Sequence, residues 1–147
     1  GRERGLSEVI AGVLPFEDAV VPTPIPGLDL LTTGVIPPNP SELLLHPRFA
    51  ELLNTVSANY DRVIIDCPPI MAVTDAAIVG RHAGTVLLAA RFAITPMAEL
   101  EAAIARLRQA GVSVNGILLN GVEQNAGYGY GYGYNYGYTY QYRTTTD

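Results

Sequence analysis

Lysine and tryptophan are absent from this chain of 147 residues, and cysteine occurs once. All nine basic residues are therefore arginines. A phosphate-binding loop needs a lysine to reach the β and γ phosphates of a nucleotide, so this chain cannot complete such a loop by itself. The single cysteine, Cys67, excludes an internal disulfide and favours a reducing, cytosolic compartment.

Long apolar runs are also missing, because none approaches the roughly 18–20 residues that cross a bilayer. The sequence has no Cys/His cluster, no Gly-x-Ser-x-Gly motif and no Gly-x-Gly-x-x-Gly motif after a strand. The formal net charge of −5 argues against nucleic acid or anionic lipid as a partner. A hydrophobic content of 48% is typical of a packed globular core.

Short apolar runs alternate with helical patterns through residues 1–126. Asn39 is expected to cap a helix that has Pro40 in its first turn, and Pro47 to interrupt and restart this helix. Buried strands are expected at Val63–Ile65, 85–90 and 117–119, and a further strand near 28–31. Helices are expected at 5–10, from Pro40 through Val56, at 75–83 and at 96–110. This order predicts the α/β class: a mostly parallel sheet of the P-loop type with helices on both faces.

Ligands of such a sheet bind at the carboxyl ends of its strands, where Gly34, Asp66, Arg91 and Asn120 are expected. Asp66 follows a β-branched run and precedes Pro68 and Pro69. A carboxylate at this position could hold the magnesium shell beside nucleotide phosphates. It could also cap the turn that follows the strand.

The other polar residues leave two interpretations open. The Asn120 amide could bind a purine edge, or form a turn with the glycine after it. Arg91 could face phosphate or lie solvated at a strand end. Asp75 is expected to stabilise a helix N-terminus by its charge. Cys67 has no assignable basic partner, which favours an inert thiol over a nucleophile.

Residues 127–147 differ sharply in composition. Tyrosine alternates with glycine or polar residues, which predicts a flexible, low-complexity tail. The exposed hydroxyls are candidate phosphoryl acceptors, while self-association through stacked rings is the alternative. The tyrosines are Tyr128, Tyr130, Tyr132, Tyr134, Tyr136, Tyr138, Tyr140 and Tyr142.

Together these features resemble the bacterial protein-tyrosine kinases of capsule and exopolysaccharide biosynthesis. The resemblance lies in Pro22–Asp29, in Gly34–Leu44 with its Pro-Pro-Asn-Pro-Ser-Glu-Leu-Leu segment, in Tyr60–Pro69, in Thr74-Asp75-Ala76 and in the tyrosine-rich end. It spans nearly the whole chain.

The resemblance implies an autokinase that uses ATP and Mg²⁺, with Asp66 as the Walker B acid and the tail tyrosines as phosphoacceptors in a neighbouring subunit of a ring-shaped oligomer. It also implies a membrane-anchored polysaccharide co-polymerase segment or partner, a cognate phosphatase, and a place at the cytoplasmic face of the inner membrane. The Walker A and A′ motifs of the family have no counterpart here. The chain alone is therefore expected to be inactive.

Two other functions remain open. One is a ParA-like P-loop ATPase switch with no tyrosine target. The other is a non-enzymatic module that self-associates through its aromatic tail.

Overall fold

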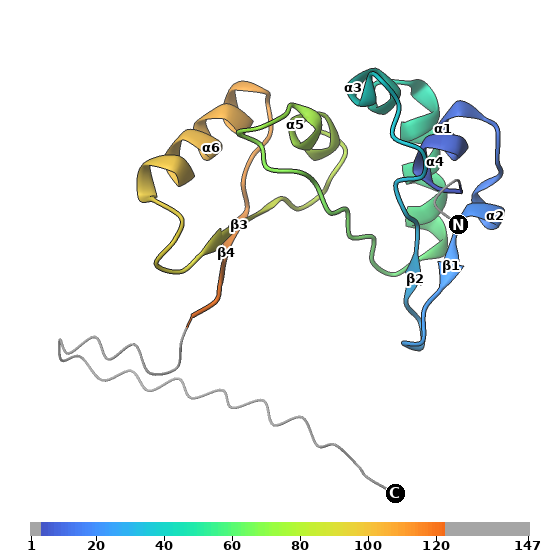
Figure 1. Ribbon diagram of the computed structural model, residues 1–147, viewed down its shortest axis with the longest axis horizontal. Coiled ribbons are helices and arrows are strands. Elements are labelled where there is room, and N and C mark those ends of the chain that lie inside the picture. Colours follow the sequence, from blue (N-terminus) through green and yellow to red (C-terminus); the bar gives the residue numbers. More distant parts are fainter. Residues whose placement is uncertain (1–3, 123–147) are drawn as a thin grey trace, which may run out of the picture.

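The computed structural model describes residues 4–122, which contain six helices and four short strands (Figure 1). The predicted tyrosine tail lies outside the described residues. The helices are α1 (Leu6–Ala11), α2 (Phe16–Ala19), α3 (Pro40–Leu44), α4 (Pro47–Asn59), α5 (Asp75–Gly80) and α6 (Met97–Gln109). The strands are β1 (Val21–Pro22), β2 (Asp29–Leu30), β3 (Leu87–Arg91) and β4 (Gly116–Asn120).

The break between α3 and α4 lies where the proline predicts it. Pro47 is the first residue of α4, a position at which its missing N–H costs no hydrogen bond. The predicted Asn39 cap is wrong in detail, since the Asn39 side chain makes no capping hydrogen bond. Its amide instead donates to Glu42 Oε2 at 3.3 Å. The short α3 therefore depends on tertiary contacts.

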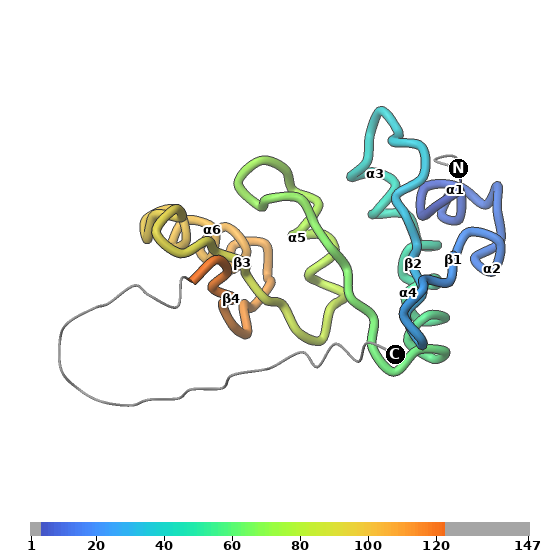
Figure 2. The backbone as a smooth tube through the Cα atoms, turned by 60° about the horizontal axis from the view of Figure 1, so that its bottom comes forward, coloured from blue at the N-terminus to red at the C-terminus, as the bar shows by residue number. Residues whose placement is uncertain are grey.

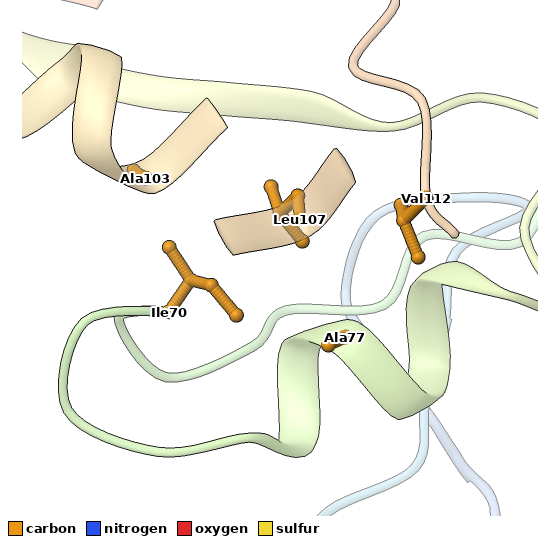
Figure 3. Packing of buried hydrophobic residues seen from close by; sticks show 5 residues of the cluster. All are labelled: Ile70, Ala77, Ala103, Leu107 and Val112. Atoms are coloured by element: carbon orange, nitrogen blue, oxygen red, sulfur yellow. The ribbon is translucent and has the colours of Figure 1, made fainter. Parts of the chain in front are cut away.

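Strands β3 and β4 form a parallel pair, with Leu88 opposite Ile117 and Arg91 opposite Asn120. The crossover between them is α6, as expected for a parallel α/β unit. Leu107 and Ala103 of α6 pack with Ile70, Ala77 and Val112 in one buried cluster (Figure 3). The prediction of an α/β fold with parallel strands is thus confirmed, although the described residues pair only two parallel strands.

A second cluster joins the N-terminal helices to α5. Ile10 of α1, Phe49 of α4 and Val79 of α5 are buried together. The Phe49 ring meets His82 edge-to-face, with ring centroids 5.6 Å apart. The expected strand near 28–31 forms, but as β2 of an antiparallel hairpin with β1.

The predicted buried strand at Val63–Ile65 is wrong for the described structure. No strand is formed there, and the Ile64 side chain is 91% exposed. A strand needs a hydrogen-bonded neighbour, and within residues 4–122 no strand pairs with this segment. Figure 2 shows it as part of the long connection from α4 to α5. None of the described helices has both the length and the apolar character to span a membrane.

Candidate functional site

A small cavity of about 150 Å³ lies where α1, α3, α5 and the 65–68 segment meet. Its polar lining residues are Ser7, Thr33, Asp66, Cys67 and Asp75. Two of the residues emphasised by the sequence, Asp66 and Asp75, therefore share one cavity although nine positions separate them. The remaining lining is apolar and comes largely from α3 and from the proline-rich segment before it.

The loop that carries Asp66 is anchored on both sides of the molecule. Cys67 packs against the Phe49 cluster, and Ile70 is buried in the α6 cluster at 5% exposure. Behind them, Pro69 accepts hydrogen bonds from Ala72 N at 2.9 Å and Val73 N at 3.3 Å. These contacts fix the backbone on which the exposed Asp66 side chain is presented.

The Asp66 carboxylate accepts no hydrogen bond from any residue between 4 and 122. The alternative role as a turn cap would require a nearby backbone N–H to donate to it. Its free oxygens therefore remain available to an external ligand, as a metal-binding role requires.

Cys67 shares this cavity with both carboxylates. Burial raises the pKa of its thiol, and the negative charges of Asp66 and Asp75 raise this pKa further. A raised pKa keeps the thiol protonated, and the thiolate is the nucleophilic form. The thiol environment thus agrees with the inert cysteine that the sequence favours.

Hydrogen bonds hold the α1 wall of the cavity in place. Ser7 Oγ donates to the Thr33 carbonyl at 2.9 Å. Glu8 accepts from Gly5 N at 2.9 Å with one carboxylate oxygen and from Val35 N at 3.1 Å with the other. These contacts between distant segments carry no sequence signal, and the sequence did not point to Ser7 or Thr33.

The other strand-end candidates do not line this cavity. Arg91 and Asn120 lie side by side at the ends of β3 and β4. The Asn120 side-chain oxygen accepts from Gly121 N at 2.8 Å, as in the turn-forming alternative. Gly34 lies in close backbone contact with Gly5 instead. A nucleotide-binding role for Asn120 remains a prediction.

The donor set of the cavity suits Mg²⁺, which prefers carboxylate and water oxygens. Among the described residues, however, no cluster of three or more acidic, histidine or cysteine side chains could enclose a metal. The volume of about 150 Å³ is also below the roughly 300 Å³ at which clefts begin to enclose small-molecule ligands. The described residues alone therefore do not form a complete metal or nucleotide site.

Comparison with known proteins shows the family to which this chain is related. No family model matches the chain. The tyrosine-protein kinase wzc of Salmonella typhimurium is 49% identical over 122 residues, which are 83% of this chain and 17% of that protein. The tyrosine-protein kinase etk of Escherichia coli K12 is 48% identical over 124 residues, again 17% of its length.

Solved structures agree. The kinase domain of Escherichia coli tyrosine kinase ETK superimposes with a TM-score of 0.81 at 46% identity, covering 91% of this chain and 52% of that domain. The BceF tyrosine kinase domain gives a TM-score of 0.74 at 46% identity, covering 81% of this chain and 49% of that one. The chain thus spans about half of a kinase domain and a sixth of the full-length relatives, and it belongs to the bacterial tyrosine-kinase family of wzc and etk.

Proposed function

We propose that the protein to which this chain belongs transfers the γ-phosphoryl group of ATP to tyrosine. The chain supplies Asp66 at the catalytic cavity and the tyrosines of residues 127–147 as acceptors. The observation that supports this most directly is the uncommitted Asp66 carboxylate in a cavity of a chain 46% identical to a solved tyrosine kinase domain. Regulation of capsule or exopolysaccharide export is the role that the resemblance implies.

In the proposed reaction, a tyrosine oxygen bonds to the γ-phosphorus while the bond to the β–γ bridging oxygen breaks and ADP leaves. Bound Mg²⁺ would neutralise the charge that develops on the phosphate oxygens. Asp66 would hold the shell of this metal, orient the incoming hydroxyl by accepting its hydrogen bond, and take up the proton that this hydroxyl loses. Asp75 adds a second negative charge at the same cavity, which favours a cation there.

The chain alone is not expected to catalyse this reaction. It has no lysine, and the described cavity is lined by two carboxylates and no basic side chain. Nucleotide phosphates would be repelled there until other residues neutralise them. Calorimetric titration of the 147-residue chain with Mg-ATP should show no saturable binding in the micromolar range. Such binding would contradict this division of roles.

Replacing Asp66→Asn in the full-length protein tests the catalytic assignment. The amide keeps the shape but loses the charge, so phosphate uptake from radiolabelled Mg-ATP should fall about 100-fold or more, a typical effect of removing one electrostatic contact to a transition state. The matched control is Asp61→Asn, because the exposed Asp61 carboxylate makes no hydrogen bond within the described residues. Equal activity of both variants would refute the role of Asp66.

Replacement of the tail tyrosines by phenylalanine tests the acceptor. Phosphate uptake should disappear while Mg-ATP hydrolysis persists, because only the acceptor hydroxyls are lost. Uptake that is unchanged would refute the tail as acceptor. If the wild-type protein hydrolyses Mg-ATP but takes up no phosphate, a ParA-like switch is favoured. If the wild type and its variants show neither hydrolysis nor phosphate uptake, a self-associating module is favoured.

The wider assembly follows the same proposal. We expect tails to enter neighbouring sites in a ring-shaped oligomer at the cytoplasmic face of the inner membrane, beside a membrane-anchored co-polymerase segment or partner. A cognate phosphatase would reverse the modification. Chemical crosslinking followed by mass spectrometry should join residues 127–147 to the cavity of another subunit. Crosslinks within single subunits alone would contradict this arrangement.

A further inference from the structure

The Ser41 side chain connects two helices that lie far apart in the sequence. Its hydroxyl donates to Asp75 Oδ1 at 2.7 Å and lies 3.4 Å from Thr74 Oγ1. Ser41 is in the first turn of α3, and Asp75 is the first residue of α5. A bond of this length to a charged acceptor belongs to the stronger class of hydrogen bonds.

This bond lies at the main junction of the described structure. Helices α1 to α4 group together with the hairpin, whereas α5 and α6 group with the parallel strands (Figure 1). Among these elements, α3 and α5 make the most extensive direct contact between the two groups. Across this contact, Ser41 of α3 makes its hydrogen bond to Asp75 of α5.

Apart from this bond, helix α3 is held by packing against α1 and α5. It has five residues and none of them is fully buried. Leu43 and Leu44 are partly buried against the cluster that contains Phe49 and Val79. A helix this short is unstable without tertiary contacts, so one strong hydrogen bond has a large effect on its position.

The same helix forms a wall of the cavity. Pro40, Leu43 and Leu44 of α3 line it together with Asp66 and Asp75. The bond between Ser41 and Asp75 therefore joins α3 to an acidic residue that lines the same cavity. Its loss would let residues 37–44 move away from Asp66.

We propose that Ser41 is a positioning residue of this site: its bond to Asp75 holds the 37–44 segment over the cavity and so fixes the space in front of Asp66. The catalytic consequence rests on the proposed kinase function. The closing of the cavity does not depend on it and can be measured separately.

Cys67 provides the first measurement, because the chain's one cysteine lines the same cavity. Its alkylation by monobromobimane, a neutral two-ring reagent, is followed by fluorescence in the 147-residue chain. Rates are compared at their high-pH limit, where the thiol is fully ionised in every variant. Ser41→Ala should raise this rate about five-fold, since one lost hydrogen bond increases the open population by roughly that factor. Ser41→Thr, which keeps the hydroxyl, should match the wild type.

The matched control is Ser57→Ala, because Ser57 is exposed on α4 and does not line the cavity. Asp75→Ala breaks the same bond from the other side. It should raise the rate similarly, and adding Ser41→Ala to it should change nothing more. Circular dichroism identifies any variant that does not fold, and the remaining variants then decide the result. If Ser41→Ala leaves the alkylation rate of Cys67 at the wild-type value, or if Ser57→Ala raises this rate equally, the proposal is overturned.

Phosphate uptake by the full-length protein is the second measurement. Ser41→Ala should lower kcat about 10-fold with a smaller change in KM for Mg-ATP, because misplacement of a wall affects the reacting geometry. Ser41→Thr should restore kcat. Faster alkylation with unchanged kcat would refute the positioning role. A wild type without phosphate uptake would refute the kinase function, while the alkylation rates would still decide whether the bond closes the cavity.

Discussion

The close approach of Gly5 to Gly34 leads to an expectation opposite to the usual effect of replacing glycine by alanine. The Gly5 backbone is extended, with φ −166° and ψ −161°, which an alanine adopts without strain. By that measure Gly5→Ala should stabilise the fold by about 0.4–1 kcal/mol, because it reduces the entropy of the unfolded chain. However, a Cβ atom at Gly5 would lie 2.5 Å from the Thr32 carbonyl oxygen and closer still to the Gly34 nitrogen.

Both of these atoms belong to the backbone, so neither can move away by a side-chain rotation. Overpacking of this kind costs about 1–3 kcal/mol. Separating the two segments would also strain the hydrogen bonds from Leu6 N to Thr32 O at 2.8 Å and from Ser7 N to Thr33 O at 3.0 Å, each worth about 1 kcal/mol. The clash therefore outweighs the entropy gain, and we expect a net loss of about 2–4 kcal/mol.

Urea unfolding followed by circular dichroism measures this effect. A loss of that size lowers the midpoint on the order of 1–2 M at the m-values typical of small proteins. Gly84→Ala is the matched control, because a Cβ at Gly84 meets no atom within 4 Å, and its midpoint should stay constant or rise. A Gly5→Ala variant as stable as Gly84→Ala would show that the two glycines do not approach in this way.

Three further outcomes are expected. The Tyr60 hydroxyl donates to Asp29 Oδ2 at 2.8 Å, and this bond, followed by burial and the Asp29 charge, raises the pKa of Tyr60. This bond should be lost as pH rises through the raised pKa of Tyr60. In a chain whose tail tyrosines are replaced by phenylalanine, absorbance at 295 nm follows Tyr60 alone and should show a lower Tyr60 pKa after Asp29→Asn. Phe49 is 2% exposed and Leu45 is 64% exposed. Calorimetry should therefore show that Phe49→Ala lowers the free energy of unfolding by about 3–5 kcal/mol, whereas Leu45→Ala changes it by no more than about 0.5 kcal/mol. Similar losses for both variants would refute the assigned core. Alternate residues of an extended chain lie about 7 Å apart, within the Debye length of about 8 Å, so several phosphates on residues 127–147 should repel one another and loosen the assembly. An oligomer mass unchanged by phosphatase treatment would contradict this.

Local sequence signals predicted the described helices except the four-residue α2. Pro47 separates α3 from α4, and α6 begins directly after Pro96. Proline acts on its own turn through a fixed φ and a missing N–H, so no tertiary information is required. The buried faces of α4 also follow from helical spacing, as Phe49, Leu52 and Val56 show.

The site was only partly predictable, because several of its contacts join residues that are distant in the sequence. Asp66 could be identified because it ends an apolar run, a pattern written in adjacent residues. Ser41 and Ser7 could not, because their partners Asp75 and Thr33 are 34 and 26 positions away. A serine has the same local sequence signature whether its hydroxyl faces solvent or joins two walls of a cavity. Only the fold brings such partners together.

The segment Val63–Ile65 shows the clearest disagreement between the local composition and the structure. Its β-branched residues favour a strand, yet a strand is a property of a pair and not of a segment. Leu118 and Leu119 of β4 are likewise more than half exposed, although they belong to a formed strand. Apolar strand sequences of this kind are typical of sheets covered on both faces. The described residues cover only part of these surfaces, and the chain matches only about half of a solved kinase domain. An apolar strand pattern therefore predicts burial only together with the neighbours that would cover it, and among the described residues such neighbours are lacking at Val63–Ile65.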